Sequence, residues 1–178
     1  INFFDWPLDR SISQDTKKPV ASDFPLCLEI VEQLVRPKRE TAKRKPYRER
    51  WWQYAERCGS LYSRIANLNR VIFQASPSKH VCFGFAQSGA VYSGPHTIIA
   101  SADVADLALM QSTIHTEWAW QFCSTMRNSG IRYNPSDFRK FPRPINLDGM
   151  SNVAEEFSSL RQSVMRDKNY GLTALYND

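Results

Sequence analysis

Apolar residues recur at helical spacing in the first third of the chain. Apolar positions 28, 30, 31, 34 and 35 predict a helix from about Pro25. A second helix is expected over Pro46–Arg57, since proline suits a first helical turn and Trp51, Trp52 and Ala55 would share a buried side. A short helical turn should follow at 61–68, after Gly59.

The same period returns later in the chain. Asp103 is a suitable N-cap for a helix with apolar positions 107, 109, 110, 114 and 118, ending near 127–130. The segment 131–144 holds three prolines and should be extended. A last helix is expected over about 149–168, leading to the segment 171–176.

Between these helices lie short runs rich in β-branched and aromatic residues, separated by Gly, Pro and Ser. The runs are Arg70–Ala75, His80–Ala86, Ala90–Tyr92 and Thr97–Ala100. We therefore predict an α+β fold, in which a small central antiparallel or mixed sheet is flanked by helices and followed by a short C-terminal helical extension. The expected division is a main domain over 1–145 and a helical segment over 146–178.

Composition narrows the class of protein. The 178 residues are 42% hydrophobic and 12% aromatic, which is typical of a folded chain with one core. No apolar run approaches the ~20 residues that span a bilayer, and no signal peptide is recognisable, so we expect no membrane partner and a chain cut from something longer. A net charge of +5 favours anionic partners without choosing between nucleic acid and a membrane surface.

The four cysteines are spaced irregularly and form no Cys-x-x-Cys pair. This argues against a zinc site and against a disulfide framework. Free, mostly buried thiols in a reducing cytoplasm are the simplest interpretation, so we expect a cytoplasmic protein.

Basic residues concentrate between positions 36 and 50, directly before the aromatic pair Trp51-Trp52. Eight cations face only two acids there, which is typical either of a solvated surface or of a surface that lies on a nucleic-acid backbone. The cations are Arg36, Lys38, Arg39, Lys43, Arg44, Lys45, Arg48 and Arg50.

The sequence contains no recognisable catalytic arrangement. Its histidines form no metal-binding pair, and the glycine-rich and Gly-x-Ser-x-Gly motifs are absent. His115 is expected to pack or cap between helix and sheet, and Asp103 and Asp106 to serve as cap and surface residues. We therefore expect no catalytic, cofactor-binding or metal-binding residue in this chain.

Two polar segments suit contact with base edges, which are read by side chains held at fixed positions. Residues 74–80 form an expected tight turn that would present Ser78, Lys79 and His80, although a solvent-facing hairpin fits the same pattern. Residues 132–137 pair a cation and an aromatic ring, Arg132 and Tyr133, with small hydrogen-bonding groups.

Several short stretches also occur in a specific order. They are Ile1-Asn-Phe-Phe-Asp-Trp-Pro7, Val35-Arg-Pro-Lys-Arg39, Tyr47-Arg-Glu-Arg-Trp-Trp-Gln-Tyr-Ala55, Leu68-Asn-Arg-Val-Ile72, Ser78-Lys-His80, Leu109-Met-Gln-Ser-Thr-Ile-His-Thr-Glu-Trp118, Arg132-Tyr-Asn-Pro-Ser-Asp137, Phe141-Pro-Arg-Pro144 and Gly171-Leu-Thr-Ala-Leu-Tyr-Asn177. Together they resemble the C-terminal part of MmeI-type restriction–modification enzymes, single chains that combine an endonuclease, an adenine-N6 methyltransferase and a target recognition domain. The resemblance covers nearly the whole chain and maps to the target recognition domain and the start of the helical tail.

The resemblance implies a non-catalytic domain that recognises double-stranded DNA for upstream methyltransferase and, if the parent cleaves, nuclease domains of the same polypeptide. The parent would use S-adenosylmethionine, and magnesium if it cleaves. The alternatives are a stand-alone enzyme of unknown chemistry and a basic protein-interaction or scaffold module. The candidate DNA contacts are Lys43, Arg44, Lys45, Arg70, Ser78, Lys79, His80, Arg132, Tyr133 and Ser136.

Overall fold

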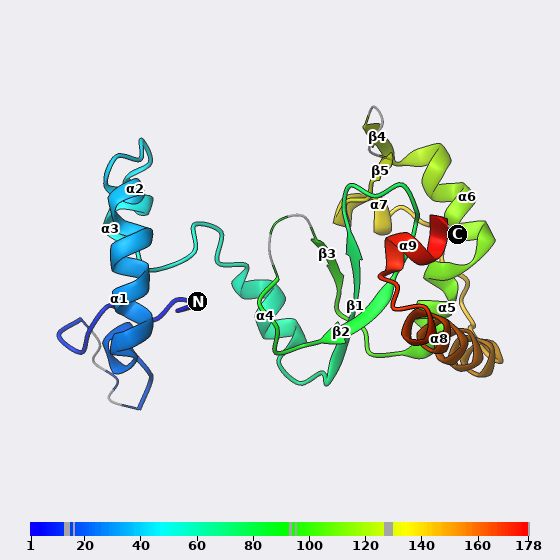
Figure 1. Cartoon of the computed structure of the whole chain (residues 1–178), viewed down its shortest axis with the longest axis horizontal. Coiled ribbons are helices and arrows are strands. Elements are labelled where there is room, and N and C mark those ends of the chain that lie inside the picture. Colours follow the sequence, from blue (N-terminus) through cyan, green and yellow to red (C-terminus); the bar gives the residue numbers. More distant parts are fainter. Residues whose placement is uncertain (13–14, 16, 93, 95, 127–129, 178) are drawn as a thin grey trace. The chain divides into compact units, whose positions relative to one another are not determined.

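The computed structural model describes residues 1–12, 15, 17–92, 94, 96–126 and 130–177. The chain forms two compact units, Ile1–Ser63 and Arg64–Asp178 (Figure 1). Each unit is described by itself. The division of function expected at residue 145 falls inside the second unit and stays a prediction.

The first unit is helical. Its core joins Phe3, Ala21 and Val31 to Trp51 and Trp52, which are 8% and 9% exposed, so the predicted burial of these two indoles is confirmed. Its elements are the 3-10 helix η1 (Ala21–Asp23) and the helices α1 (Pro25–Leu34), α2 (Arg36–Glu40), α3 (Lys45–Glu49) and α4 (Gly59–Ile65), the last of which crosses into the second unit.

The helix predicted over Pro46–Arg57 is much shorter than expected. It ends at Glu49, and Ala55 is exposed rather than buried. The side chains of Trp52 and Gln53 both donate hydrogen bonds to the carbonyl oxygen of Trp6, at 2.9 and 2.7 Å. These long-range bonds fix the two side chains on the N-terminal segment, a tertiary constraint that the local pattern does not contain.

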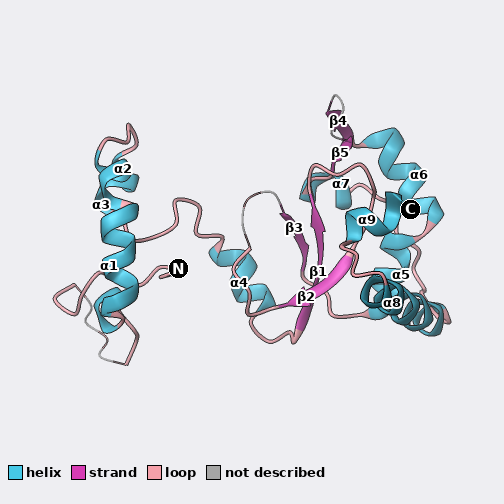
Figure 2. Ribbon diagram, viewed as in Figure 1, coloured by secondary structure: helices cyan, strands magenta, loops and turns pink. Residues whose placement is uncertain are grey.

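The second unit is built around a three-stranded antiparallel sheet with the order β2-β1-β3 (Figure 2). The strands are β1 (Arg70–Ala75), β2 (Gly84–Gln87) and β3 (His96–Ile99), with Ile72 opposite both Phe85 and Ile99. The prediction of β1 is confirmed, β2 is shorter than the predicted run, and the strand expected at Ala90–Tyr92 is wrong. A separate hairpin, β4 (Ser124–Met126) with β5 (Gly130–Arg132), was not expected from the sequence.

Helices follow the sheet and cover it. The single helix expected after Asp103 is two helices, because Ser112 adopts an extended conformation and its hydroxyl accepts a hydrogen bond from the backbone N–H of His115. The helices are α5 (Val104–Gln111), α6 (Thr113–Phe122), α7 (Pro135–Phe138), α8 (Met150–Asp167) and α9 (Leu172–Asn177). The region 127–129, where the long helix was expected to end, lies outside the described residues.

The predicted fold class is confirmed as α+β, with a small sheet, flanking helices and a C-terminal helical extension. The core of the second unit joins Ile72 and Ile99 of the sheet to Leu107 and Met110 of α5 and Ala119 of α6. In the part of the chain that the structure describes, no helix has the length and apolar character needed to cross a membrane.

Candidate nucleic-acid interface

The two polar segments that the sequence singles out lie against each other. Ser78 and Ile131 form an isolated antiparallel bridge, in which Ser78 N–H donates to the Ile131 carbonyl at 3.1 Å and Ile131 N–H donates to the Ser78 carbonyl at 2.8 Å. This bridge joins the turn after β1 to the strand that carries Arg132. A backbone pairing therefore brings together segments that are distant in the sequence.

Gly130 makes this close approach possible. Its φ is +89°, and a Cβ atom placed there would lie 2.0 Å from the carbonyl oxygen of Ser78 and 2.6 Å from the Cα of Lys79. Only glycine has both the backbone freedom and the lack of a side chain that this position requires. The sequence pattern indicated Gly130 merely as the end of a helix.

A cleft of about 570 Å³ opens between the two segments and the start of β3. Arg132 and Asn134 line the cleft from the end of β5 and the segment after it, Ser76 and Pro77 from the turn after β1, and His96 from the start of β3. The complete described lining is Ser76, Pro77, Gly94, His96, Thr97, Met126, Arg132, Tyr133, Asn134 and Pro135. The cleft thus presents a guanidinium, an amide, a hydroxyl and an imidazole on three separate backbone segments.

Beneath this region, His115 links α6 to the core. Its side chain is fully buried; Nδ1 lies 2.8 Å from the Met110 carbonyl and Nε2 lies 2.8 Å from the Tyr133 hydroxyl. A carbonyl only accepts, so Nδ1 carries the proton and Nε2 accepts from Tyr133. Burial lowers the pKa of His115 from 6.5 to about 4, so the ring is neutral at pH 7. The expected packing role of His115 is confirmed.

Tyr133 belongs to the core rather than to the surface. Its side chain is 1% exposed, its ring lies edge-on to Phe83, and burial raises the pKa of its hydroxyl. Its backbone carbonyl accepts a 2.7 Å hydrogen bond from the Thr97 hydroxyl at the cleft. Burial removes the ring from the surface, so we do not include Tyr133 among the proposed DNA contacts. Its position instead fixes the backbone next to Arg132 and Asn134.

Lys79 and His80 follow the bridge and differ in their surroundings. Lys79 is exposed. His80 is partly buried, with Nε2 2.9 Å from Oδ1 of Asn177 and its ring 5.7 Å from that of Tyr176. The Tyr176 hydroxyl in turn accepts from Gln111 at 3.1 Å. The C-terminal helix α9 therefore holds the end of the turn in place.

The three remaining candidate DNA contacts of the second unit are Ser78, Ser136 and Arg70. Ser78 accepts a hydrogen bond from His80 N–H at 3.2 Å and is partly buried. Ser136 is exposed on α7. Arg70 lies over the Phe85 ring at 3.8 Å while its Nε donates to the Ala102 carbonyl, so only part of its guanidinium remains available.

The three basic candidates of the first unit, Lys43, Arg44 and Lys45, are all exposed between α2 and the start of α3. Lys45 pairs with Glu49 at 3.5 Å and Arg44 approaches Glu56 at 3.9 Å, but these are solvent-exposed pairs of small energetic value. Lys43 makes no ion pair with any described residue. The stretch therefore retains a surplus of accessible positive charge.

The cysteines and the described acidic residues are the next candidate reactive groups. All four cysteines are free, and burial raises the pKa of Cys82 and raises that of Cys123 to about 11, so both stay protonated at pH 7. Among the described residues, no group of three or more His, Cys, Asp or Glu side chains is placed to hold a metal ion. The expected cap at Asp103 is confirmed, since its carboxylate accepts from Ala105 N–H.

Comparison of the chain with protein-family models, with curated proteins and with solved structures found no match.

Proposed function

We propose that this chain is the sequence-specific double-stranded DNA recognition domain of an adenine-N6 DNA methyltransferase of the restriction–modification class, of the MmeI type that its sequence resembles. The observation that carries the proposal is the cleft between the bridged segments. Residues selected from the sequence as base-reading candidates line it or flank it, on backbone held by a β-bridge.

The chemistry of the cleft suits base edges. An arginine reads guanine through two parallel hydrogen bonds and an asparagine reads adenine in the same way, provided that both are held on restricted backbone. Arg132 is exposed and follows the bridged residue Ile131. The Asn134 amide donates to Asp137 at 3.3 Å at the start of α7, so Asn134 would have to give up this bond to read a base and otherwise holds the segment in place. Lys79 is exposed on the other bridged segment and supplies a third donor.

The basic stretch of the first unit suits phosphates. Phosphate contacts require accessible cations rather than fixed geometry, and they carry no sequence information. Lys43, Arg44 and Lys45 meet that requirement, because they are exposed and only weakly paired. Arg70, Ser78, His80 and Ser136 are the remaining proposed contacts.

Catalysis is assigned in this proposal to other domains of the same cytoplasmic polypeptide. A methyltransferase domain would bind S-adenosylmethionine and flip the target adenine out of the duplex. If the parent cleaves DNA, a nuclease domain would use magnesium. This chain would aim those domains at a site and perform no chemistry itself.

A salt titration of DNA binding tests the proposal. The purified chain is mixed with a fluorescent duplex of about three helical turns, and the dissociation constant is measured across salt concentrations. Changing Lys43, Arg44 and Lys45 together to Gln should weaken binding to every duplex. The salt slope should fall by roughly 0.9 for each phosphate that these side chains no longer neutralise.

The matched control changes Lys17 and Lys18 to Gln, because both are exposed cations of the same unit that lie outside the basic stretch. That variant should bind DNA as the unchanged chain does. Equal affinity and equal slope in the triple variant would show that the stretch is only a solvated surface. Binding to polyglutamate instead of DNA would favour the protein-interaction alternative.

A further inference from the structure

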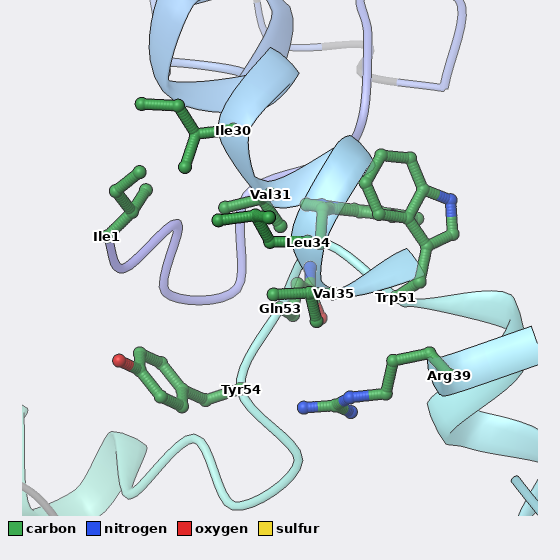
Figure 3. A pocket seen from close by; sticks show the side chains of 10 residues that line it. Ile1, Ile30, Val31, Leu34, Val35, Arg39, Trp51, Gln53 and Tyr54 are labelled. Atoms are coloured by element: carbon green, nitrogen blue, oxygen red, sulfur yellow. The ribbon is translucent and has the colours of Figure 1, made fainter. Parts of the chain in front are cut away.

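The first unit contains a pocket whose lining does not include Lys43, Arg44 or Lys45. It has a volume of about 270 Å³ and lies between α1, α2 and the segment 51–54 (Figure 3). Val31 and Trp51 belong to the core and form its base. We call it the α1 pocket, and the side chains that decide its chemistry are Ile30, Leu34, Arg39, Gln53 and Tyr54.

The walls of the α1 pocket expose large apolar side chains. Leu34 is 66% exposed, Ile30 is 49% exposed and Tyr54 is 47% exposed. Single exposed apolar residues are ordinary, but a group that surrounds a concave surface is typical of an interaction site. Apolar walls of this kind suit an aliphatic side chain and offer nothing to a phosphate.

One cation lies among these apolar walls. Figure 3 shows the Arg39 guanidinium pointing to the side of the pocket where Tyr54 lies. Its neighbour Arg36 is held by Glu32 and Glu40, whereas Arg39 makes no ion pair with a described residue and instead lies 4.9 Å from the centre of the Tyr47 ring. The charge at the pocket is therefore positive and not neutralised.

Gln53 adds a polar group at the base. It is 5% exposed, its amide nitrogen donates to Trp6, and its carbonyl oxygen has no hydrogen-bond partner among the described residues. Buried acceptors in folded proteins normally have a donor. An occupant with a backbone N–H would supply one once the amide turns toward the pocket.

We propose that the α1 pocket binds an acidic protein segment, which inserts an aliphatic side chain between Ile30, Leu34 and Tyr54 and places a neighbouring carboxylate on Arg39. Charge complementarity selects this occupant. The surrounding stretch of cations repels basic partners, while a planar guanidinium suits a carboxylate. The proposal goes beyond DNA recognition and stands or fails independently of it.

The test uses the purified 178-residue chain and a fluorescein-labelled probe peptide, Gly-Asp-Leu-Glu-Gly, with blocked ends. A second probe, Gly-Asp-Gly-Glu-Gly, has the same charge without the aliphatic side chain. Fluorescence anisotropy should show that the leucine peptide binds roughly ten times more tightly than the glycine peptide, because only it fills the apolar walls.

Two pairs of variants locate the site. Arg39→Gln and Leu34→Asn should each weaken binding of the leucine peptide roughly tenfold, since one removes the carboxylate partner and the other an apolar wall. Their controls are Lys38→Gln, an exposed neighbouring cation, and Leu26→Asn, 77% exposed on the same helix; neither residue lines the pocket. Both controls should bind as the unchanged chain does.

The proposal is overturned if the two peptides bind equally, if neither binds, or if a control weakens binding as much as its partner variant. Because all four substituted residues are at least partly exposed, loss of folding does not confuse the result. The DNA affinity of the same variants is measured in parallel. A chain that binds DNA but neither peptide would refute this inference and leave the proposed function standing.

Discussion

Replacing Gly130 by alanine tests whether the cleft lined by Ser76 and Arg132 depends on the bridge between its two segments. The new methyl group would lie 2.0 Å from the Ser78 carbonyl oxygen, far inside any real contact distance. The three atoms that the methyl group would meet first all belong to the backbone of Ser78 and Lys79, so no side-chain rotation can relieve the clash. The segment at Ser78 must therefore move, and its two hydrogen bonds to Ile131 must break.

The magnitude follows from two contributions. A non-glycine residue in the left-handed region costs about 1–2 kcal/mol. Each backbone hydrogen bond that breaks costs about 0.5–1.5 kcal/mol. The Gly130→Ala variant should therefore lose about 2–5 kcal/mol of the free energy of unfolding. Its preference among DNA duplexes should also fall, because Arg132 and Lys79 no longer share a fixed frame.

Urea unfolding measures the loss, and Gly149 supplies the control. Gly149 also has a positive φ, of +79°, but a Cβ placed there meets nothing within 4 Å. Gly149→Ala should therefore cost only the backbone contribution of about 1–2 kcal/mol. If the two variants lose the same free energy, the close approach at Ser78 does not hold the segments together and the reasoning is refuted.

Three further results are expected. The pKa of folded His115 is about 4 and that of an unfolded histidine is about 6.5, so the unfolded state binds a proton more readily. The free energy of unfolding should therefore fall by about 3 kcal/mol as pH drops from 6.5 to 4. His115→Gln should lack this part of the pH dependence, and an unchanged profile in that variant would contradict the assignment. Trp52→Ala should cost about 3–5 kcal/mol in urea unfolding, whereas Trp120→Ala, at a residue 43% exposed, should cost less than about 1 kcal/mol; equal losses would mean that Trp52 is not a core anchor. Asn177→Ala should alter DNA affinity by freeing His80, while its cost in stability stays within the roughly 0.5–1.5 kcal/mol of one hydrogen bond; unchanged DNA binding would show that α9 only supports the fold.

Local patterns predicted the elements whose signals lie within a few residues. Pro25 begins α1, Asp103 caps α5, and the run rich in β-branched and aromatic residues at Arg70–Ala75 forms β1. The patterns failed where distant residues decide the structure. The helix after Pro46 ends early with Trp52 and Gln53 bonded to Trp6, and the helix after Asp103 breaks because Ser112 can cap a new one.

In the candidate site, too, local sequence predicted some features and long-range pairing decided the others. Residue types selected the segments around Ser78 and Arg132, but nothing in the local sequence indicated that the two segments pair. Gly130 was the available signal, since a glycine before a β-branched residue and an arginine also fits a close backbone approach. The burial of Tyr133 was not predicted, because an aromatic ring suits a core as well as a base and its partner His115 lies 18 residues away in the sequence.

Selection from a random duplex library tests sequence-specific DNA recognition most directly. The purified chain is incubated with duplexes that carry a randomised segment, and the bound duplexes are sequenced over successive rounds. One motif should be enriched, and Arg132→Ala or Lys79→Ala should relax it at one position, since a bidentate contact contributes about 1–3 kcal/mol of discrimination. Lys17→Ala should leave the motif unchanged. Equal recovery of all duplexes, or the same motif in every variant, would contradict base reading by this cleft.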